Sequence, residues 1–91
     1  MVLIDSEKRS RPVEKQLQAF FRLTGAEAKL AARIADGSAL GVAASELGIA
    51  KETSRSQLKS VFRKTGTHRQ AELVALLMPI IRQLKSEVPI G

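Results

Sequence analysis

The chain contains no cysteine, tryptophan or tyrosine, and only three of its 91 residues are phenylalanine. The absence of cysteine excludes disulfides, thiolate catalysis and most zinc sites, and it is compatible with a reducing cytosol. Because aromatic residues are so few, the apolar content consists mainly of aliphatic residues and alanine, which suits closely packed small helices better than a sheet. We therefore expect an all-α fold.

Long apolar runs are absent as well. The chain starts MVLIDSEKRSRP, in which four apolar residues are followed by charges, so that neither a signal peptide nor a membrane span is predicted. We expect a cytoplasmic protein. A chain of this length has room for one small domain, which buries only a little over ~60% of its unfolded surface.

The positive charge of the chain is concentrated in its middle. The net charge is +6, and between Ala50 and Arg69 there are six basic residues and one acidic residue. Such a stretch indicates a polyanionic partner. Its apolar residues, Leu58, Val61 and Phe62, are needed for the core, which argues against insertion into a membrane surface.

The same stretch has the pattern of an amphipathic helix from Ile49 to Gly66. A shorter helical pattern, Leu40 to Leu47, precedes it, and Gly48-Ile49-Ala50 joins the two. A lone basic helix is often an ordinary solvated surface, but this order predicts a helix-turn-helix. One face should pack, through Ser54, Leu58, Val61, Phe62 and Thr65; the opposite face carries Glu52, Ser56, Lys59, Ser60 and Arg63, with Arg55 and Lys64 on the flanks.

Upstream of these helices, Val2-Leu3-Ile4 resembles a short strand, and a charged segment follows it as far as Pro12. Because a lone strand has no partner in a helical chain, we interpret residues 1–11 as a linker or the remnant of an upstream sensor domain; a disordered tail is the alternative. A short helix is predicted from about Val13 to Phe21.

Capping signals mark the helix that comes next. Thr24 and Glu27 form a capping box, which starts a helix from Gly25 to about Ala35, and Gly37 is expected to end it in a left-handed conformation. Further along, Gly66 is the predicted C-cap of the basic helix. Thr67 or His68 is then expected to cap a last helix that begins near Arg69.

The last helix carries more apolar residues than one helix of a small domain needs. It either packs under the N-terminal helix or forms a dimer face. Pro79 predicts a kink or break, because proline lacks the amide donor and its ring clashes with the preceding turn. We expect residues 12–85 to form one domain and residues 86–91 to be a flexible tail.

The ordered set Leu23-Thr24-x-x-Glu27, Gly37, Ala43-x-x-Leu47-Gly48-Ile49, Thr53, Leu58, Phe62-x-Lys64-x-Gly66 and Arg69-x-x-Leu73 resembles the LuxR-type (GerE-like) helix-turn-helix domain of bacterial transcription regulators. The resemblance covers Leu23 to Leu77. It implies a four-helix bundle, here with an additional short N-terminal helix, that binds double-stranded DNA as a homodimer, often through its last helix. No cofactor, metal or small-molecule ligand is implied.

Site residues follow from the resemblance, position by position. The base-reading positions fall on Arg55, Ser56 and Lys59, and arginine and lysine can both donate to guanine O6 and N7. Phosphate contacts, which fix register, fall on Thr53, Gln57, Arg63, Lys64 and Arg69. The dimer interface falls on Val74, Leu77 and Ile81.

Departures from the family pattern limit these expectations. Ser54, Gln57 and Thr65 replace common Val, His and Leu, so the target sequence cannot be inherited. An alternative function is an interaction module that pairs with a full-length regulator and blocks its DNA binding. No enzyme activity is predicted, because no pattern places a base beside a nucleophile. His68 has no second histidine or cysteine with it, which favours a turn or capping role over metal binding or pH sensing.

Overall fold

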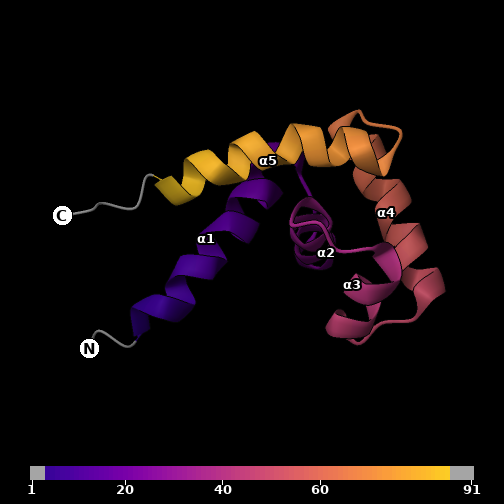
Figure 1. Cartoon of the computed structure of the whole chain (residues 1–91), viewed down its shortest axis with the longest axis horizontal. Coiled ribbons are helices and arrows are strands. Elements are labelled where there is room, and N and C mark those ends of the chain that lie inside the picture. The colour runs from indigo at the N-terminus through magenta and orange to yellow at the C-terminus, as the bar shows by residue number, and fades with distance from the viewer. Residues whose placement is uncertain (1–3, 87–91) are drawn as a thin grey trace.

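The computed structural model describes the backbone of residues 4–86 and the side chains of residues 13–84. This part of the chain contains five helices and no strand (Figure 1). The predicted all-α class is therefore confirmed. The helices are α1 (Ile4–Phe21), α2 (Gly25–Ala35), α3 (Leu40–Leu47), α4 (Lys51–Thr65) and α5 (Gln70–Ser86). None of them has the length and hydropathy that a membrane crossing requires.

Helix α2 lies at the centre of the fold and packs against each of the other four helices. Its apolar stripe, Leu30, Ala31 and Ile34, is buried. Around α2, the α4 and α5 helices form an arc, and α1 and α5 diverge towards the side of the molecule where both chain ends lie (Figure 1). The core that results joins side chains from all five helices: Leu17, Leu23, Ala28, Leu30, Ala31, Ile34, Ala35, Ala43, Leu58, Val61, Leu73 and Leu77.

Three helices end on a glycine with positive φ. Gly37 (φ 101°), Gly48 (φ 71°) and Gly66 (φ 74°) follow α2, α3 and α4. After each glycine, the next amide donates back to a carbonyl five residues earlier, as in Ile49 N–H to Ala44 O at 3.0 Å. Glycine adopts this conformation without a Cβ penalty, so the predicted helix ends at Gly37 and Gly66 are confirmed.

Helix α1 is longer than the sequence predicted. It begins at Ile4 rather than near Val13, so the predicted start of this helix is wrong and the charged segment up to residue 11 is helical from Ile4 onwards. This segment contains no glycine, and its Glu, Lys and Arg residues are good helix formers. Of the proposed strand, Ile4 is helical, and Val2 and Leu3 lie outside the described residues. The existence of an upstream domain remains a prediction.

Helix α5 continues through Pro79, so the predicted break does not occur. Pro79 and Ala75, whose carbonyl loses its amide partner, are both exposed, and water can satisfy that carbonyl. On the inner side, buried Leu73 and Leu77 hold the helix on the core before the proline, and Ile80 packs there after it. Ser86 is the last residue of α5, and residues 87–91, predicted to be flexible, lie outside the described part of the chain.

Candidate nucleic-acid interface

The two helices predicted for the helix-turn-helix are present as α3 and α4. Helix α3 spans Leu40–Leu47, Gly48 turns the chain with its left-handed conformation, and α4 starts at Lys51. The two helices pack against one another and against α2. A short connection of Gly48, Ile49 and Ala50 therefore sets α4 at the edge of the bundle, with one side on the core and the other towards solvent (Figure 1).

The inner face of α4 is the predicted packing stripe. Ser54, Leu58 and Val61 are buried, and Phe62 packs partly against the core. Ser54 is fully buried at a position that the family resemblance would fill with valine. Its hydroxyl donates to the carbonyl of Lys51 at 2.6 Å, which satisfies the polar group inside the same helix. A serine is thus accommodated here without an unpaired donor.

The three predicted base-reading residues, Arg55, Ser56 and Lys59, all lie exposed on α4. Arg55 and Lys59 are one turn apart and therefore neighbours on the helix surface. Arg63 lies one further turn along α4, on the same side, and is also exposed. We call Arg55, Ser56, Lys59 and Arg63 the exposed face of α4.

The exposed face of α4 leads into an open cleft of about 530 Å³ beside the turn to α5. Lys59 and Arg63 supply the cations of this cleft, and Phe62 supplies an apolar wall. Arg69, a predicted phosphate contact, is exposed just before α5 begins, and Thr53 is exposed in the first turn of α4. Arg69 and Thr53 are therefore both accessible to solvent, as a phosphate contact requires. The cleft is lined by Lys59, Phe62, Arg63, Gly66, Thr67 and His68.

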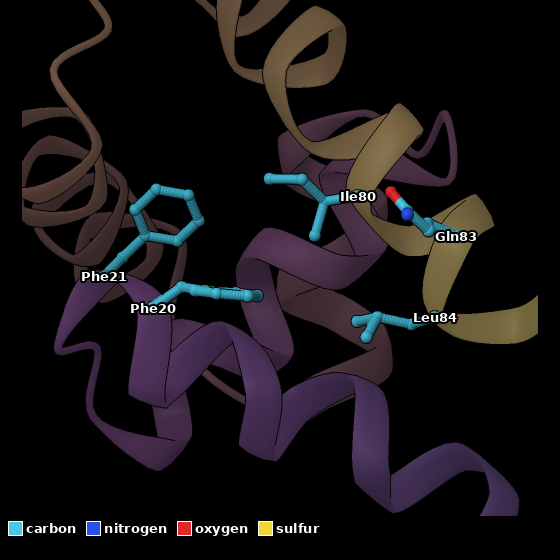
Figure 2. Close-up of a pocket in the computed structure, with 5 residues that line it drawn as sticks. All are labelled: Phe20, Phe21, Ile80, Gln83 and Leu84. Atoms are coloured by element: carbon cyan, nitrogen blue, oxygen red, sulfur yellow. The ribbon is translucent and has the colours of Figure 1, made fainter. Parts of the chain in front are cut away.

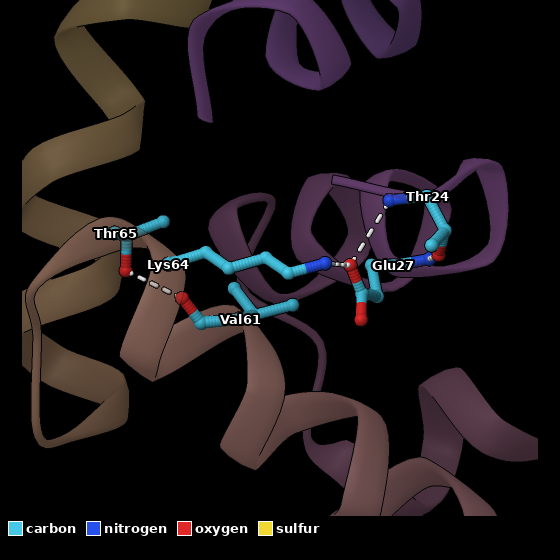
Figure 3. Close-up of polar contacts among 5 residues, drawn as sticks. All are labelled: Thr24, Glu27, Val61, Lys64 and Thr65. Carbon is cyan, nitrogen blue, oxygen red and sulfur yellow. Dashed lines mark hydrogen bonds and ion pairs between the residues drawn. The ribbon is translucent and has the colours of Figure 1, made fainter. Parts of the chain in front are cut away.

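Lys64, another predicted phosphate contact, is exposed, but its ammonium group bonds to another helix of the same chain. Its Nζ lies 2.8 Å from Oε1 of Glu27 on α2 (Figure 3). The same oxygen accepts the Thr24 N–H at 2.9 Å, while the Glu27 N–H donates to the Thr24 hydroxyl at 3.1 Å, which confirms the predicted capping box. Glu27 is 7% exposed. No sequence signal links Lys64 to Glu27, because the two are distant in the chain and no periodicity connects them.

This contact changes the acidity of Glu27. Burial raises the pKa of the carboxyl group, but hydrogen bonds from Lys64, Thr24 and Ser60 and the charge of Lys64 outweigh burial and lower the pKa from 4.5 to about 2. Glu27 is therefore a carboxylate at neutral pH, and it neutralises the one cation that α4 turns towards α2. The exposed face of α4 keeps its own positive charges.

Gln57, also a predicted phosphate contact, is half-buried. It lines a pocket of about 240 Å³ together with Ala26, Lys29, Leu47 and Ile49. Its Oε1 is buried and has no hydrogen-bond partner among the described residues. A phosphate would accept a hydrogen bond from the amide NH2 group of Gln57 and not from its carbonyl, so the phosphate contact of Gln57 stays a prediction.

The predicted dimer residues of α5 do not share one environment. Leu77 is fully buried in the core, so its assignment to a dimer interface is wrong. Helix α5 packs against α2 and α1, and Leu77 belongs to the shared core. Val74 and Ile81 are half-buried and pack against the same core. The apolar excess of α5 is therefore used largely within the chain.

The N-terminal cap of α5 in the structure differs from the predicted one. Helix α5 begins at Gln70, and the Glu72 carboxylate accepts the backbone N–H of His68 at 2.8 Å. The hydroxyl of Thr67 instead lies 2.9 Å from that of Thr65. The Glu72 side chain therefore caps the N-terminus of α5, in place of the side chains of Thr67 and His68. Within the described residues, no group of three His, Cys, Asp or Glu side chains could hold a metal ion.

No protein-family model matches the chain, and comparison with curated proteins and with solved structures gives no match either.

Proposed function

We propose that this chain is a sequence-specific, double-stranded DNA-binding domain of the LuxR type that regulates bacterial transcription. The observation that carries the proposal is the arrangement of α4. Its inner face is anchored by Ser54 and Leu58, and its outer face presents Arg55 and Lys59 to solvent directly after a helix-turn-helix turn. An exposed cationic helix of this kind can enter the major groove.

In the proposed complex, Arg55 and Lys59 donate hydrogen bonds to guanine O6 and N7, and Ser56 contacts a base edge beside them. Thr53, Arg63 and Arg69 contact phosphates and fix the register of the helix. Two copies would place their α4 helices in successive major grooves, with half-sites about one helical turn apart.

The contact of Lys64 with Glu27 modifies the phosphate assignment. Because Lys64 bonds to Glu27, the proposal assigns the main phosphate contacts to Arg63 and Arg69. In this proposal Lys64 orients α4 on α2 and adds little to the salt dependence of binding.

A selection experiment tests the proposal. The purified chain is mixed with random duplex DNA at two salt concentrations, and the bound fraction is sequenced. We expect a two-fold-symmetric motif and an affinity that falls steeply as salt rises. Absence of binding at low salt would contradict the proposal and favour an interaction module that pairs with a full-length regulator.

A further inference from the structure

His68 lines the cleft beside the turn to α5, and the proposed function leaves it without a role. The cap of α5 comes from Glu72, so the imidazole ring of His68 is left for another contact. The residue lies in the cleft together with Lys59 and Arg63 of α4. We call this hollow of about 530 Å³ the α4–α5 cleft.

Glu72 fixes the position of His68 at the start of α5. Its Oε1 accepts the backbone N–H of His68 at 2.8 Å and lies 3.7 Å from Nδ1 of the ring. A carboxylate at that distance pairs with a protonated imidazole, in which both nitrogens are donors. With Nδ1 beside Glu72, Nε2 is the ring donor available to a ligand. The side chain of His68 is 86% exposed, so a ligand can reach it.

The charged side chains around the α4–α5 cleft are mostly cations. Lys59 and Arg63 lie one turn apart on α4, and neither forms a salt bridge with another described residue. On the α5 side, Arg69 is exposed next to His68, and Glu72 supplies a single carboxylate. An anion that accepts several hydrogen bonds therefore suits this cleft, and a phosphate group is such an anion.

A second hollow of similar size shows what distinguishes the α4–α5 cleft. It lies between α1 and α5, has a volume of about 450 Å³, and is drawn with its lining side chains in Figure 2. Its walls carry no charge, because they consist of Phe20, Phe21, Ile80, Gln83 and Leu84. A phosphate would find no cation on these walls, so we expect it to bind in the α4–α5 cleft and not in this groove.

We propose that the α4–α5 cleft binds a phosphate group between Arg63 and His68, and that His68 binds it as the protonated imidazolium. The inference rests on the proposed function, in which the phosphate belongs to the DNA backbone, and it adds His68 and one proton to that contact. Lys59 contributes positive charge to the cleft and remains a proposed base-reading residue.

Phosphate binding and proton binding should strengthen one another at His68. A phosphate places negative charge beside the ring and favours its protonated form. By thermodynamic linkage, protonation of the ring favours the phosphate by the same factor. Histidine is the side chain whose charge ordinarily changes between pH 5 and 8, and His68 is the only histidine in the chain. We therefore expect the affinity for DNA to rise as the pH falls from 8 to 6.

Binding titrations against one mixed-sequence duplex at pH 6 and pH 8, at constant ionic strength, test the inference. The parent chain should bind about threefold more tightly at pH 6, an effect of the size typical of an exposed charge pair. His68→Gln keeps a polar side chain without the titrating charge, so it should bind equally at both pH values, as weakly as the parent at pH 8. Glu27, whose pKa is about 2, stays ionised throughout this range, so its contact with Lys64 persists.

A relocated histidine is the matched control. Gln83→His, made in the His68→Gln chain, places the same titrating group in the uncharged groove between α1 and α5. The double variant should bind the duplex with no pH dependence, because the end of α5 lies on the opposite side of the molecule from α4 (Figure 1). Thermal melts followed by circular dichroism show whether both variants fold, and both should, since residues 68 and 83 are exposed.

Nuclear magnetic resonance distinguishes phosphate in DNA from free phosphate. Inorganic phosphate is added to the labelled chain without DNA, and the side-chain signals of His68 and Arg63 are followed. The methyl signals of Ile80 and Leu84 in the uncharged groove serve as the reference. Movement of the His68 and Arg63 signals alone shows that the cleft binds phosphate itself, and movement only on addition of the duplex assigns the site to the DNA backbone. His68 signals that respond to neither would overturn the inference.

Three titration results would also overturn it. They are a parent chain with the same affinity at both pH values, a pH dependence that persists in His68→Gln, and a pH dependence that Gln83→His restores. The proposed function fails separately. A chain that binds no duplex at either pH, but whose His68 signals respond to inorganic phosphate, would contradict the proposed function alone, whereas duplex binding without pH dependence would contradict only this inference.

Discussion

The ammonium group of Lys64 lies 2.8 Å from the Glu27 carboxylate and joins the end of α4 to the start of α2. The carboxylate is also part of the capping box of α2, since it accepts the Thr24 amide. The buried Glu27 carboxylate thus caps the N-terminus of α2 and also binds the last turn of α4. This contact therefore links the end of the proposed DNA-reading helix to α2.

Acid should destabilise the protein through Glu27. The pKa of this residue is about 2 in the folded chain against an ordinary 4.5, so the unfolded state binds the proton more tightly. The stabilisation is fully present above pH 4.5 and is lost as the pH falls from 4.5 towards 2. We expect a loss of about 2 kcal/mol, measured by urea unfolding across this range. In Glu27→Gln this part of the pH dependence should vanish; a variant curve parallel to that of the parent would contradict the assignment.

Replacing Lys64 should affect folding more than DNA contacts. Lys64→Ala leaves the buried Glu27 carboxylate without its cation, so we expect unfolding to become easier by about 2 kcal/mol. Arg63→Ala, on the neighbouring exposed position, should leave stability unchanged and lower the slope of log affinity against log salt by about one. Urea unfolding and binding titrations at several salt concentrations measure both effects. The reverse pattern would return Lys64 to the phosphate contacts.

Substitution of the proposed base-reading residues should have a different effect from substitution of Lys64 or Arg63. Arg55→Ala and Lys59→Ala are expected to weaken binding to the preferred duplex by about 1 to 3 kcal/mol and to relax specificity at one base pair each. Both side chains are exposed, so their removal should leave the melting temperature unchanged. Competition titrations against singly substituted duplexes measure the loss at each position. Equal losses on all sequences would show that these residues contact only phosphates.

Arg22 offers a stabilising substitution. It has φ 58° directly after α1, and the following Leu23 amide donates to Gln18 O at 3.2 Å, the same turn that glycine makes after α2, α3 and α4. A side chain in this conformation costs about 1 kcal/mol, so Arg22→Gly should raise the free energy of unfolding by up to that amount. Arg22→Ala removes the same charge but keeps a Cβ, and it should give no such gain in the same urea titration.

Local signals in the sequence predicted much of this structure. The capping box at Thr24, the glycines at 37 and 66, and the Gly48 turn are each written in a few neighbouring residues, and the structure has all of them. The buried stripe of α4 follows from its period of 3.6 residues. These features depend on the backbone and on residues within one or two turns, which a single sequence displays directly.

Features that depend on distant parts of the chain were missed. Leu77 is buried in a core that several helices share, and Lys64 bonds to a residue 37 positions away. The passage of α5 through Pro79 was also unexpected. The start of α1 at Ile4 was missed as well, although the residues there are good helix formers. At Pro79, packing of Leu77 and Ile80 on the core outweighs the local cost of proline. Contacts between residues distant in the sequence can be evaluated only when the arrangement of the helices is known.

The central position of α2 has a consequence for how the domain unfolds. Because α2 contacts every other helix, its loss leaves only the contacts of α3 with α4 and of α1 with α5 among the main helix pairs, whereas an outer helix can open while the rest stays on α2. Amide protons around Leu30 and Ile34 should then exchange with solvent only through opening of the whole chain, and should be among the last to exchange. The proposed DNA-reading helix, α4, is an outer helix, so its amide protons should exchange at a lower free energy of opening than those of α2.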